Sequence, residues 1–244
     1  IAMSLHYPQA HPPAPASRHE IQPGVFWLRM PLPFQLDHIN LWLLRDGDGW
    51  VIVDTGFAND TVRELWQRIL DALDGPVKRL IVTHFHPDHL GLATWLQEQT
   101  GAELWMTTGE FLTAHAVWNE YGGHGARYMV EQFRQHGLGE ELLAKFQRRG
   151  SGYRLAVPTL PDYFSRIMDG DVLRIDGREW RIIIGHGHAP EHAALYCREL
   201  DVLISGDMLL PRISTNISVF AVTPTADALG WFLRSLSDMA RDLP

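Results

Sequence analysis

The sequence predicts a layered α/β fold, and three observations carry this prediction. Strand patterns open the chain, and alternating strand and helix patterns follow them up to residue 107. Strand patterns return at residues 171–205, after a long stretch that shows only helical periodicity. Three of the predicted strands end at a histidine or an aspartate, so chemically active side chains gather at strand ends.

The first part of the chain predicts a lead segment followed by strands. Residues 1–23 form a Pro-rich lead that we expect to lie extended on the surface, and Ile1-Ala2 ahead of Met3 has the form of an expression remnant. We expect one domain over residues 24–244. Strands are predicted at residues 24–30, 39–45 and 50–53, with a Gly-rich hairpin turn between the last two.

The next segment predicts alternating helices and strands. An amphipathic helix begins at Asp60 or Thr61 and stops at Gly75-Pro76. Residues 78–83 predict a buried strand, residues 89–99 a second helix, and residues 103–107 a short strand.

Residues 108–165 predict a helical insertion. The periodicity occurs in three pieces, around residues 109–119, 125–136 and 139–148, and glycines separate them. We expect the insertion to fold over one face of the sheet layer as a lid. Its histidines and arginines are expected to be mostly solvated, with one or two lining a pocket: His115, His124, His136, Arg127, Arg134, Arg148 and Arg149.

The last part of the chain returns to strands. Residues 171–184 predict a hairpin, and residues 193–197 and 202–205 predict two further strands. Residues 225–240 predict a final amphipathic helix.

The segment Thr-His-Phe-His-Pro-Asp-His, which ends at His89, follows an apolar run directly. Because the strand ends near Thr83, we expect His84 and His86 to turn toward one point, and Asp88 and His89 toward a second point beside it. Neutral imidazole and carboxylate groups together suit Zn²⁺, Fe²⁺ or Mn²⁺, and the absence of thiolates argues against a closed structural zinc site. A histidine-rich surface loop is the weaker interpretation, because chance seldom produces this spacing.

Two other strand ends carry the same residue types. His186, His188 and His192 follow the predicted hairpin, and Asp207 follows the strand at 202–205. A metal site between two sheets requires such a meeting of strand ends. Asp54, after the strand at 50–53, has two open interpretations: it orients a metal-ligating histidine, or it forms a turn and caps the next helix.

Composition excludes several classes of protein. The formal net charge of −8 speaks against a protein that grips nucleic acid by its backbone. Cys197 is the single cysteine, so an internal disulfide is excluded, and we expect this residue in the core. No apolar run approaches the ~20 residues of a membrane span, so we expect no membrane partner and a cytoplasmic location.

With these residues in hand, the sequence resembles the metallo-β-lactamase-fold hydrolases over residues 24–107 and 168–240. The residues from His84 to His89 match the superfamily's H-x-H-x-D-H motif, and residues 187–192 are similar to its G-H-T-x-x-H element. The resemblance implies a four-layer αββα sandwich, with two mixed sheets face to face, helices outside, and the site at one edge.

The resemblance also implies roles for individual residues. It implies six metal ligands: His84, His86 and His188 for one metal, Asp88 and His89 for a second, and Asp207 as the bridge. Asp88 would also orient the attacking water or shuttle its proton, which makes it the candidate catalytic residue. His192 resembles a histidine that lies behind the ligands in glyoxalase II-like and lactonase-like branches, and Asp54 matches the family's D-T-G turn.

The sequence departs from the family near its C-terminus. A further histidine, on a loop after the last helix, usually completes the second metal site, but the sequence ends at Pro244, where the strand leading to that loop should begin. We expect the natural protein to continue into that strand and loop. The open alternatives are an incomplete second site, or a homodimer in which a neighbouring subunit supplies the histidine.

These expectations favour a metal-dependent hydrolase. A metal-bound hydroxide would attack an ester-like bond of a small-molecule substrate, such as a thioester, lactone or β-lactam. The alternatives are a phosphodiesterase or ribonuclease of the tRNase Z type and a mononuclear iron sulfur dioxygenase, while a non-catalytic module would be expected to lose ligands. We expect two Zn²⁺ ions in the complete site, with Fe or Mn as alternatives; the substrate-binding residues stay unknown at this stage.

Overall fold

The computed structural model describes residues 5–149 and 152–243 of the chain. The expected expression remnant at Ile1-Ala2, the side chain of Arg149 and the terminal Pro244 lie outside what is described.

The first sheet has seven strands, which lie in sequence order from β1 to β7. The first four pair in antiparallel fashion: β1 (His19–Gln22), β2 (Val25–Pro31), β3 (His38–Asp46) and β4 (Gly49–Val53). The last three continue the sheet in parallel: β5 (Val77–Ile81), β6 (Glu103–Met106) and β7 (Ser165–Arg166). β1 lies within the expected surface lead, so residues 19–22 join the sheet, and β7 adds a strand where the sequence showed only helical periodicity.

The second sheet has four strands in the order β11-β10-β9-β8. β8 (Val172–Ile175), β9 (Arg178–Gly185), β10 (His192–Cys197) and β11 (Val202–Ile204) all pair in antiparallel fashion. The expectation of two mixed sheets was therefore wrong for this sheet. Its strands follow one another through short turns, which join antiparallel neighbours, whereas parallel neighbours need a long crossover.

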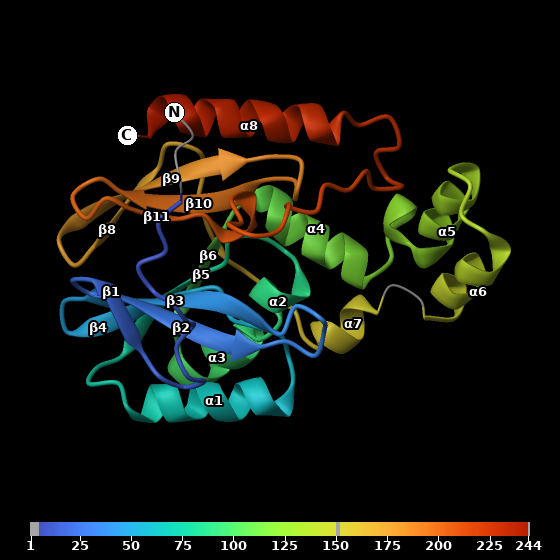
Figure 1. The fold of residues 1–244 in the computed structure, drawn as a ribbon. Helices are drawn as coiled ribbons and strands as arrows, with labels where there is room; N and C mark the ends of the chain where they lie inside the picture. Colours follow the sequence, from blue (N-terminus) through green and yellow to red (C-terminus); the bar gives the residue numbers. More distant parts are fainter. Residues whose placement is uncertain (1–4, 150–151, 244) are drawn as a thin grey trace.

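The two sheets lie face to face with helices outside them, which gives four layers (Figure 1), and three apolar clusters hold these layers together. One cluster lies between the two sheets and includes Val53, Ile81, Trp180 and Cys197, which is buried as predicted. A second joins the first sheet to the helices α1 (Asp60–Asp71) and α3 (Ala93–Thr100), and a third joins the second sheet to α8 (Ala228–Asp242). Side chains that alternate along a strand supply both faces of a sheet, so each sheet can take part in two clusters.

The expected single helix at residues 89–99 is two helices. α2 (Pro87–Leu90) ends at Gly91, and α3 begins after Leu92. The chain is closely packed at the break, because a Cβ atom on Gly91 would lie 2.6 Å from the carbonyl oxygen of Gly56. The N–H of Leu92 donates to the Oγ1 atom of Thr55, at 3.2 Å, which anchors the break to the turn after β4.

The insertion lies at one end of the sandwich, not over a sheet face as expected. Its helices are α4 (Thr108–Trp118), a 3-10 turn (Gly122–His124), α5 (Ala126–Gln135), α6 (Glu140–Arg149) and α7 (Tyr153–Ala156). The three predicted helical pieces correspond to α4, α5 and α6. In Figure 1, α5 and α6 extend furthest from the sheets, while α4 and α7 lie against the ends of the strands.

Among the described residues, no helix combines the length and the apolar character that a membrane crossing would need.

Candidate metal centre

Three strand ends meet at one edge of the sandwich. The first is the loop from β5 into α2, the second is the loop between β9 and β10, and the third follows β11. A hydrogen bond from the N–H of Ala193 to the carbonyl oxygen of Thr83, 2.9 Å long, joins the first two directly across the sheets. This contact brings the two histidine clusters of the sequence together.

One group of side chains could hold a metal ion at this edge: His84, His86, His188 and Asp207. The Nε2 atom of His84 lies 3.0 Å from Nδ1 of His86 and 3.2 Å from Nε2 of His188. The Oδ2 atom of Asp207 lies 3.4 Å from the same nitrogen of His188. Ligand atoms around a tetrahedral zinc ion, with bonds of ~2.0–2.1 Å, lie ~3.3 Å apart. The spacing of this group therefore fits one small cation.

A second group consists of Asp88, His89 and Asp207. The Nε2 atom of His89 lies 3.6 Å from an oxygen of Asp88 and 3.4 Å from Oδ1 of Asp207. That nitrogen is buried and has no hydrogen-bond partner among the described residues. Because buried polar atoms are usually paired, its position beside two carboxylates fits a cation held there. Asp207 belongs to both groups.

Each of two ligand-type imidazoles is oriented from behind. The Nδ1 atom of His89 lies 2.7 Å from a carboxylate oxygen of Asp54, and Nδ1 of His188 lies 2.7 Å from the carbonyl oxygen of Asn216. In both rings the Nδ1 side is engaged, so Nε2 faces the site, as is usual for metal-ligating histidines.

Asp54 does not cap the helix that follows it. Its oxygens accept hydrogen bonds from the N–H and the hydroxyl of Thr83, at 2.7 and 2.8 Å, as well as facing His89. The cap of α1 is Asn59, whose side chain accepts the N–H of Val62. The geometry therefore separates the two interpretations of Asp54 and matches the one in which it orients a histidine.

His192 lies behind the first group. Its Nε2 atom accepts a hydrogen bond from the backbone N–H of Asp207, at 3.1 Å, so it positions the carboxylate that both groups share. His186, in contrast, points away, and its Nδ1 atom lies 2.7 Å from the carbonyl oxygen of Pro190.

Burial keeps most of the imidazoles neutral. It lowers the pKa of His84, and it lowers the pKa of His86 and of His192 to about 3. Burial also lowers the pKa of His89, but the carboxylates of Asp207, Asp54 and Asp88 outweigh it and raise that pKa. Neutral imidazole is the metal-binding form, and the surplus of carboxylate around His89 is what a cation would balance.

The site opens into a cavity of about 490 Å³. Its polar wall includes Asp88, His89, His188 and Asp207. Its other wall is largely apolar and comes from Leu36, β3 and residues 203–216, for example Trp42, Leu209 and Ile213. This volume is in the range of small-molecule sites.

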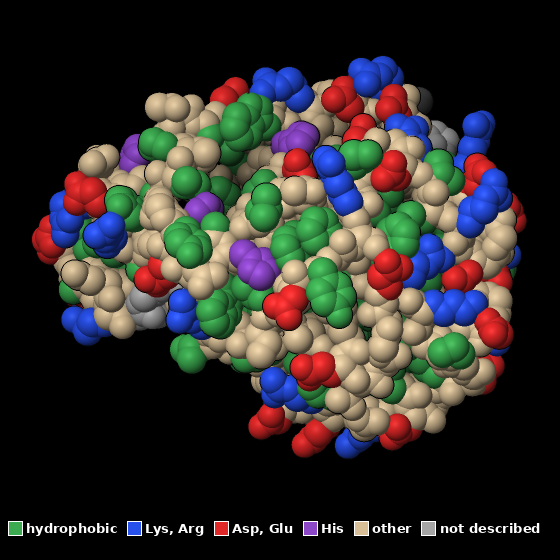
Figure 2. Space-filling model, turned by 180° about the vertical axis from the view of Figure 1, so that it is seen from behind, with side chains coloured by type: hydrophobic (Ala, Val, Ile, Leu, Met, Phe, Trp, Pro, Cys, Tyr) green, Lys and Arg blue, Asp and Glu red, His purple; other side chains and the backbone are tan. Residues whose placement is uncertain are grey.

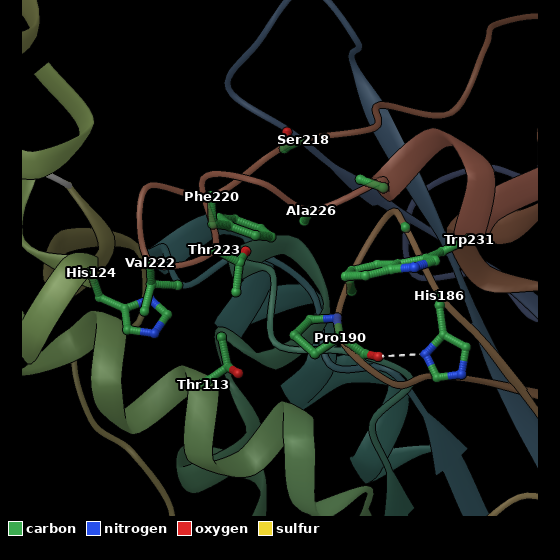
Figure 3. Close-up of a pocket in the computed structure, with 13 residues that line it drawn as sticks. Thr113, His124, His186, Pro190, Ser218, Phe220, Val222, Thr223, Ala226 and Trp231 are labelled. Atoms are coloured by element: carbon green, nitrogen blue, oxygen red, sulfur yellow. Dashed lines mark hydrogen bonds between the residues drawn. The ribbon is translucent and has the colours of Figure 1, made fainter. Parts of the chain in front are cut away.

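A second cavity, of about 610 Å³, lies beside the loop that carries His188 (Figure 3). Thr113 of α4 and the neighbouring pair of His124 and Val222 form one side, and Phe220 and Trp231 contribute to the rest of the wall. The cavity also touches Gly187 and Ala189, the two neighbours of His188.

The histidines and arginines of the insertion take different places. His124 lines the second cavity, and the Nε2 atom of His115 lies 2.9 Å from the carbonyl oxygen of Pro161. His136, Arg127, Arg134 and Arg148 are exposed, as expected for solvated helix residues.

Sequence reasoning missed Thr83, Asn216 and Glu110, which hold the ligand loops from outside the motifs. Only Glu110 had a local signal, because Thr107-x-x-Glu110 has the form of a capping box. Residues 208–224, which include Asn216 and much of both cavity walls, show no helix or strand pattern that would have drawn attention to them.

Comparisons with known proteins agree with this geometry. Residues 35–242 match the sequence model of the metallo-beta-lactamase superfamily. The hydroxyacylglutathione hydrolase GloC of Haemophilus influenzae is 30% identical over 177 residues, which are 72% of this chain and 68% of that protein. This chain spans 49% and 59% of the length of two further curated relatives.

Two solved structures share the fold over most of this chain. A beta-lactamase domain protein from Burkholderia ambifaria is 44% identical, with a TM-score of 0.82 over 96% of this chain and 70% of that one. A metallo-beta-lactamase family protein from Thermus thermophilus is 32% identical, with a TM-score of 0.77 over 91% of this chain and 71% of that one. The predicted αββα architecture is thereby confirmed.

Proposed function

The chain belongs to the metallo-beta-lactamase superfamily and is a hydrolase of that fold; from this premise we propose that it cleaves an ester-like bond of a small molecule with the help of bound metal ions. The observation that carries the proposal is the meeting of two donor groups that share Asp207, with all ligand atoms of each group within 4.8 Å of one another.

We propose thioesters as the first substrate class, with lactones and β-lactams next. The support for thioesters is the relative from Haemophilus influenzae, which is named as a hydroxyacylglutathione hydrolase. A small substrate is supported by the cavity of about 490 Å³ at the site. It is also supported by the face seen in Figure 2, where Lys and Arg side chains are interspersed with Asp and Glu rather than gathered into one basic patch.

The proposed metal ligands are the two donor groups described above. His84, His86 and His188 would hold one ion, Asp88 and His89 the other, and Asp207 would lie between them. Zinc suits this set of imidazole and carboxylate donors, and iron or manganese would suit it as alternatives. Bound metal ions of this kind lower the pKa of a water molecule and polarise the bond under attack.

Asp88 is the proposed proton acceptor in the reaction. It lines the cavity, and burial raises its pKa, which favours the uptake of a proton. The proton of the attacking water passes to the carboxylate of Asp88 and then to the leaving group. Asp54, Asn216 and His192 hold the surrounding side chains in position during this transfer.

The insertion and residues 208–224 are the proposed source of substrate specificity. Residues 208–224 supply apolar wall to both cavities, and the insertion adds Thr113 and His124 to the second one, so the apolar part of a substrate would lie against residues 208–224. This is a proposal for a lid beside the site, since the helices do not cover a sheet face.

The test combines metal analysis of the purified protein with a panel of thioesters, lactones, a chromogenic β-lactam and a bis-nitrophenyl phosphate. We expect bound zinc and turnover of an ester-like member of the panel. His188→Ala should lose most of the metal and ~100-fold or more of the activity, because it removes a direct ligand. His136→Ala is the control: its side chain is exposed and lines neither cavity, so this variant should keep both the metal and the activity.

Turnover of the phosphodiester alone would favour the nuclease alternative. Oxygen consumption with a sulfur substrate and one iron per chain would favour the dioxygenase alternative. Equal activity in wild type and His188→Ala would reject a metal-dependent reaction at this site.

A further inference from the structure

The peptide groups around Phe85 are held by two side chains from the insertion. Phe85 stands between the ligand-type residues His84 and His86. Its N–H donates to the Oε2 atom of Glu110 at 2.8 Å, and its carbonyl oxygen accepts the hydroxyl of Tyr153 at 2.5 Å. Both hydrogen bonds are buried, and they reach across 25 and 68 residues of sequence.

Glu110 also holds the second histidine loop. Its Oε1 atom accepts the backbone N–H of Glu191 at 2.6 Å, and Glu191 directly precedes His192. One carboxyl group thus connects the loop of His84 and His86 to the loop between β9 and β10. The two loops belong to different sheets, so this bridge fixes their relative position.

Two further hydrogen bonds join the start of α4 to the loop between β9 and β10. The side chain of Glu191 accepts the N–H of Gly109 at 2.7 Å, and its carbonyl oxygen accepts the hydroxyl of Thr107 at 3.0 Å. A Cβ atom at position 109 would lie 2.7 Å from the Cδ atom of Glu191, so a larger residue there would displace the Glu191 side chain and its bond to the N–H of residue 109.

Burial of the Glu110 carboxyl group costs folding free energy, which an apolar side chain at the same position would not. Glu110 has no exposed surface, and burial of a carboxyl group is unfavourable unless its oxygens are paired. A glutamate at this helix position would ordinarily reach back to its own N-cap residue, Thr107. Here both oxygens are instead directed to backbone N–H groups of the two loops.

From these contacts we infer that Glu110 and Tyr153 are positioning residues, which fix the Phe85 peptide and so set the angle between the rings of His84 and His86. This inference rests on the proposed metal-dependent function. A tilt of the Phe85 peptide groups would rotate the side chains of His84 and His86. The spacing of 3.0 Å between the ring nitrogens of these two histidines therefore depends on the hydrogen bonds that hold Phe85. Groups that support ligands from behind commonly affect metal affinity by ~10–100-fold.

The test uses Glu110→Gln and Tyr153→Phe in the full chain. Zinc affinity is measured by competition with a chromophoric chelator, and the geometry is read from the visible absorption of the cobalt-loaded protein. We expect Glu110→Gln to bind zinc ~10–100-fold more weakly, because an amide cannot accept hydrogen bonds at both ends. Tyr153→Phe should show a smaller loss in the same direction, and both should change the cobalt spectrum.

Exposed residues of the same types supply the controls. Tyr163→Phe removes a hydroxyl from a side chain that is 79% exposed, and Glu98→Gln changes an exposed carboxylate of α3. Both should match wild type in zinc affinity and in the cobalt spectrum. The thermal unfolding of each metal-free variant shows whether a loss of affinity is only a loss of folded protein.

The outcomes separate this inference from the proposed function. If both positioning variants bind zinc within about threefold of wild type and keep its cobalt spectrum, the inference is overturned. It is also overturned if their affinity falls only as far as their unfolded fraction rises. If His84→Ala binds zinc as tightly as wild type, the proposed metal site itself fails.

Discussion

At the scale of single residues, hydrogen bonds hold the side chains of the site in defined orientations. Thr83 illustrates this: its hydroxyl lies 2.9 Å from Nδ1 of His84 and 2.8 Å from Asp54, which in turn faces His89. Asp54 adopts a backbone φ of 64°, a conformation that aspartate tolerates better than most residues. A short polar residue at this turn can therefore face back toward the ligand loop, which a β-branched residue could not do without strain.

Glu110 should give the metal-free protein a stability that depends on pH. Burial raises its pKa to about 8 from an ordinary value of 4.5, although the hydrogen bonds from Glu191 and Phe85 oppose the rise. Of the nearby charged groups, Glu191 raises the pKa and His89 lowers it. A carboxyl group with a raised folded pKa contributes stability that is fully present below pH 4.5 and is lost as the pH rises toward 8.

We therefore expect the unfolding temperature of metal-free wild type to fall, relative to that of Glu110→Gln, between about pH 5 and about pH 9. Thermal scans of both proteins in chelator at a series of pH values would measure the difference. Two curves that run parallel across this range would contradict the prediction, and Glu98→Gln serves as the exposed control.

At the scale of secondary structure, the insertion has two parts that pack differently. Phe111 and Ala114 of α4 and Tyr153 of α7 belong to the apolar cluster behind the first sheet. α5 and α6 lie outside that cluster, and Phe133 and Phe146 pack the two helices against each other, with ring centroids 5.3 Å apart. The inner part belongs to the body of the protein, whereas the outer part is a helical hairpin that touches its edge.

Replacing residues 126–149 by a short Gly/Ser linker should leave the metal content unchanged and raise KM for apolar substrates. The reason is the contact of Gln132 with the carbonyl oxygen of Val219, at 3.0 Å, which supports the wall that includes Phe220. Metal stoichiometry and steady-state kinetics are the measurements, and Gln132→Ala tests the single contact. Loss of metal from the shortened protein would show that the outer hairpin also supports the site.

At the scale of the whole molecule, the two donor groups are unequal. The described residues give the first group four donors and the second three, and Asp207 is counted in both. The donors of the first group also come from three separate strand ends, so an ion there joins both sheets. The first ion therefore has more protein contacts and a larger part in holding the layers together.

We expect titration of the metal-free chain with zinc to show two unequal steps, with the first ion bound at least ~10-fold more tightly. The first equivalent should produce most of the rise in unfolding temperature, because its donors join three strand ends whereas those of the second ion join two. Calorimetric titration followed by thermal scans at one and two equivalents would measure both effects. Two equal steps would contradict the prediction.

The sequence predicted much of this site because its ligands follow strands whose apolar pattern is local. The strand before His84 and the hairpin before His188 could each be predicted from a few residues, and the motif spacing indicated which side chains would gather at their ends. Glu110 shows the limit: Thr107 does accept its N–H, at 3.4 Å, so the capping signal is real, yet the carboxyl group serves two distant loops.

The elements that were predicted wrongly depend on packing across the chain. The break between α2 and α3 lies where Gly91 packs against Gly56 and Leu92 bonds to Thr55, and β7 has only two residues, too few for any alternation to show. Neither feature has a cause within its own stretch of sequence. The antiparallel order of the second sheet, in contrast, has a local cause in the short turns between its strands, and the expectation of a mixed sheet came from the family resemblance alone.

The wide sequence separation of the ligands has a consequence for the time course of biosynthesis. His84 and His188 are 104 residues apart, and Asp207 comes later still. At synthesis rates of ~5–20 residues per second, the early histidines would leave the ribosome roughly 5 to 20 s before His188. During that interval the nascent chain contains Asp54 and Thr83, and Glu110 follows 26 residues after His84, but the second sheet that closes the site is missing. The proposed metal ions could therefore meet their full set of donors only after the second sheet has been made.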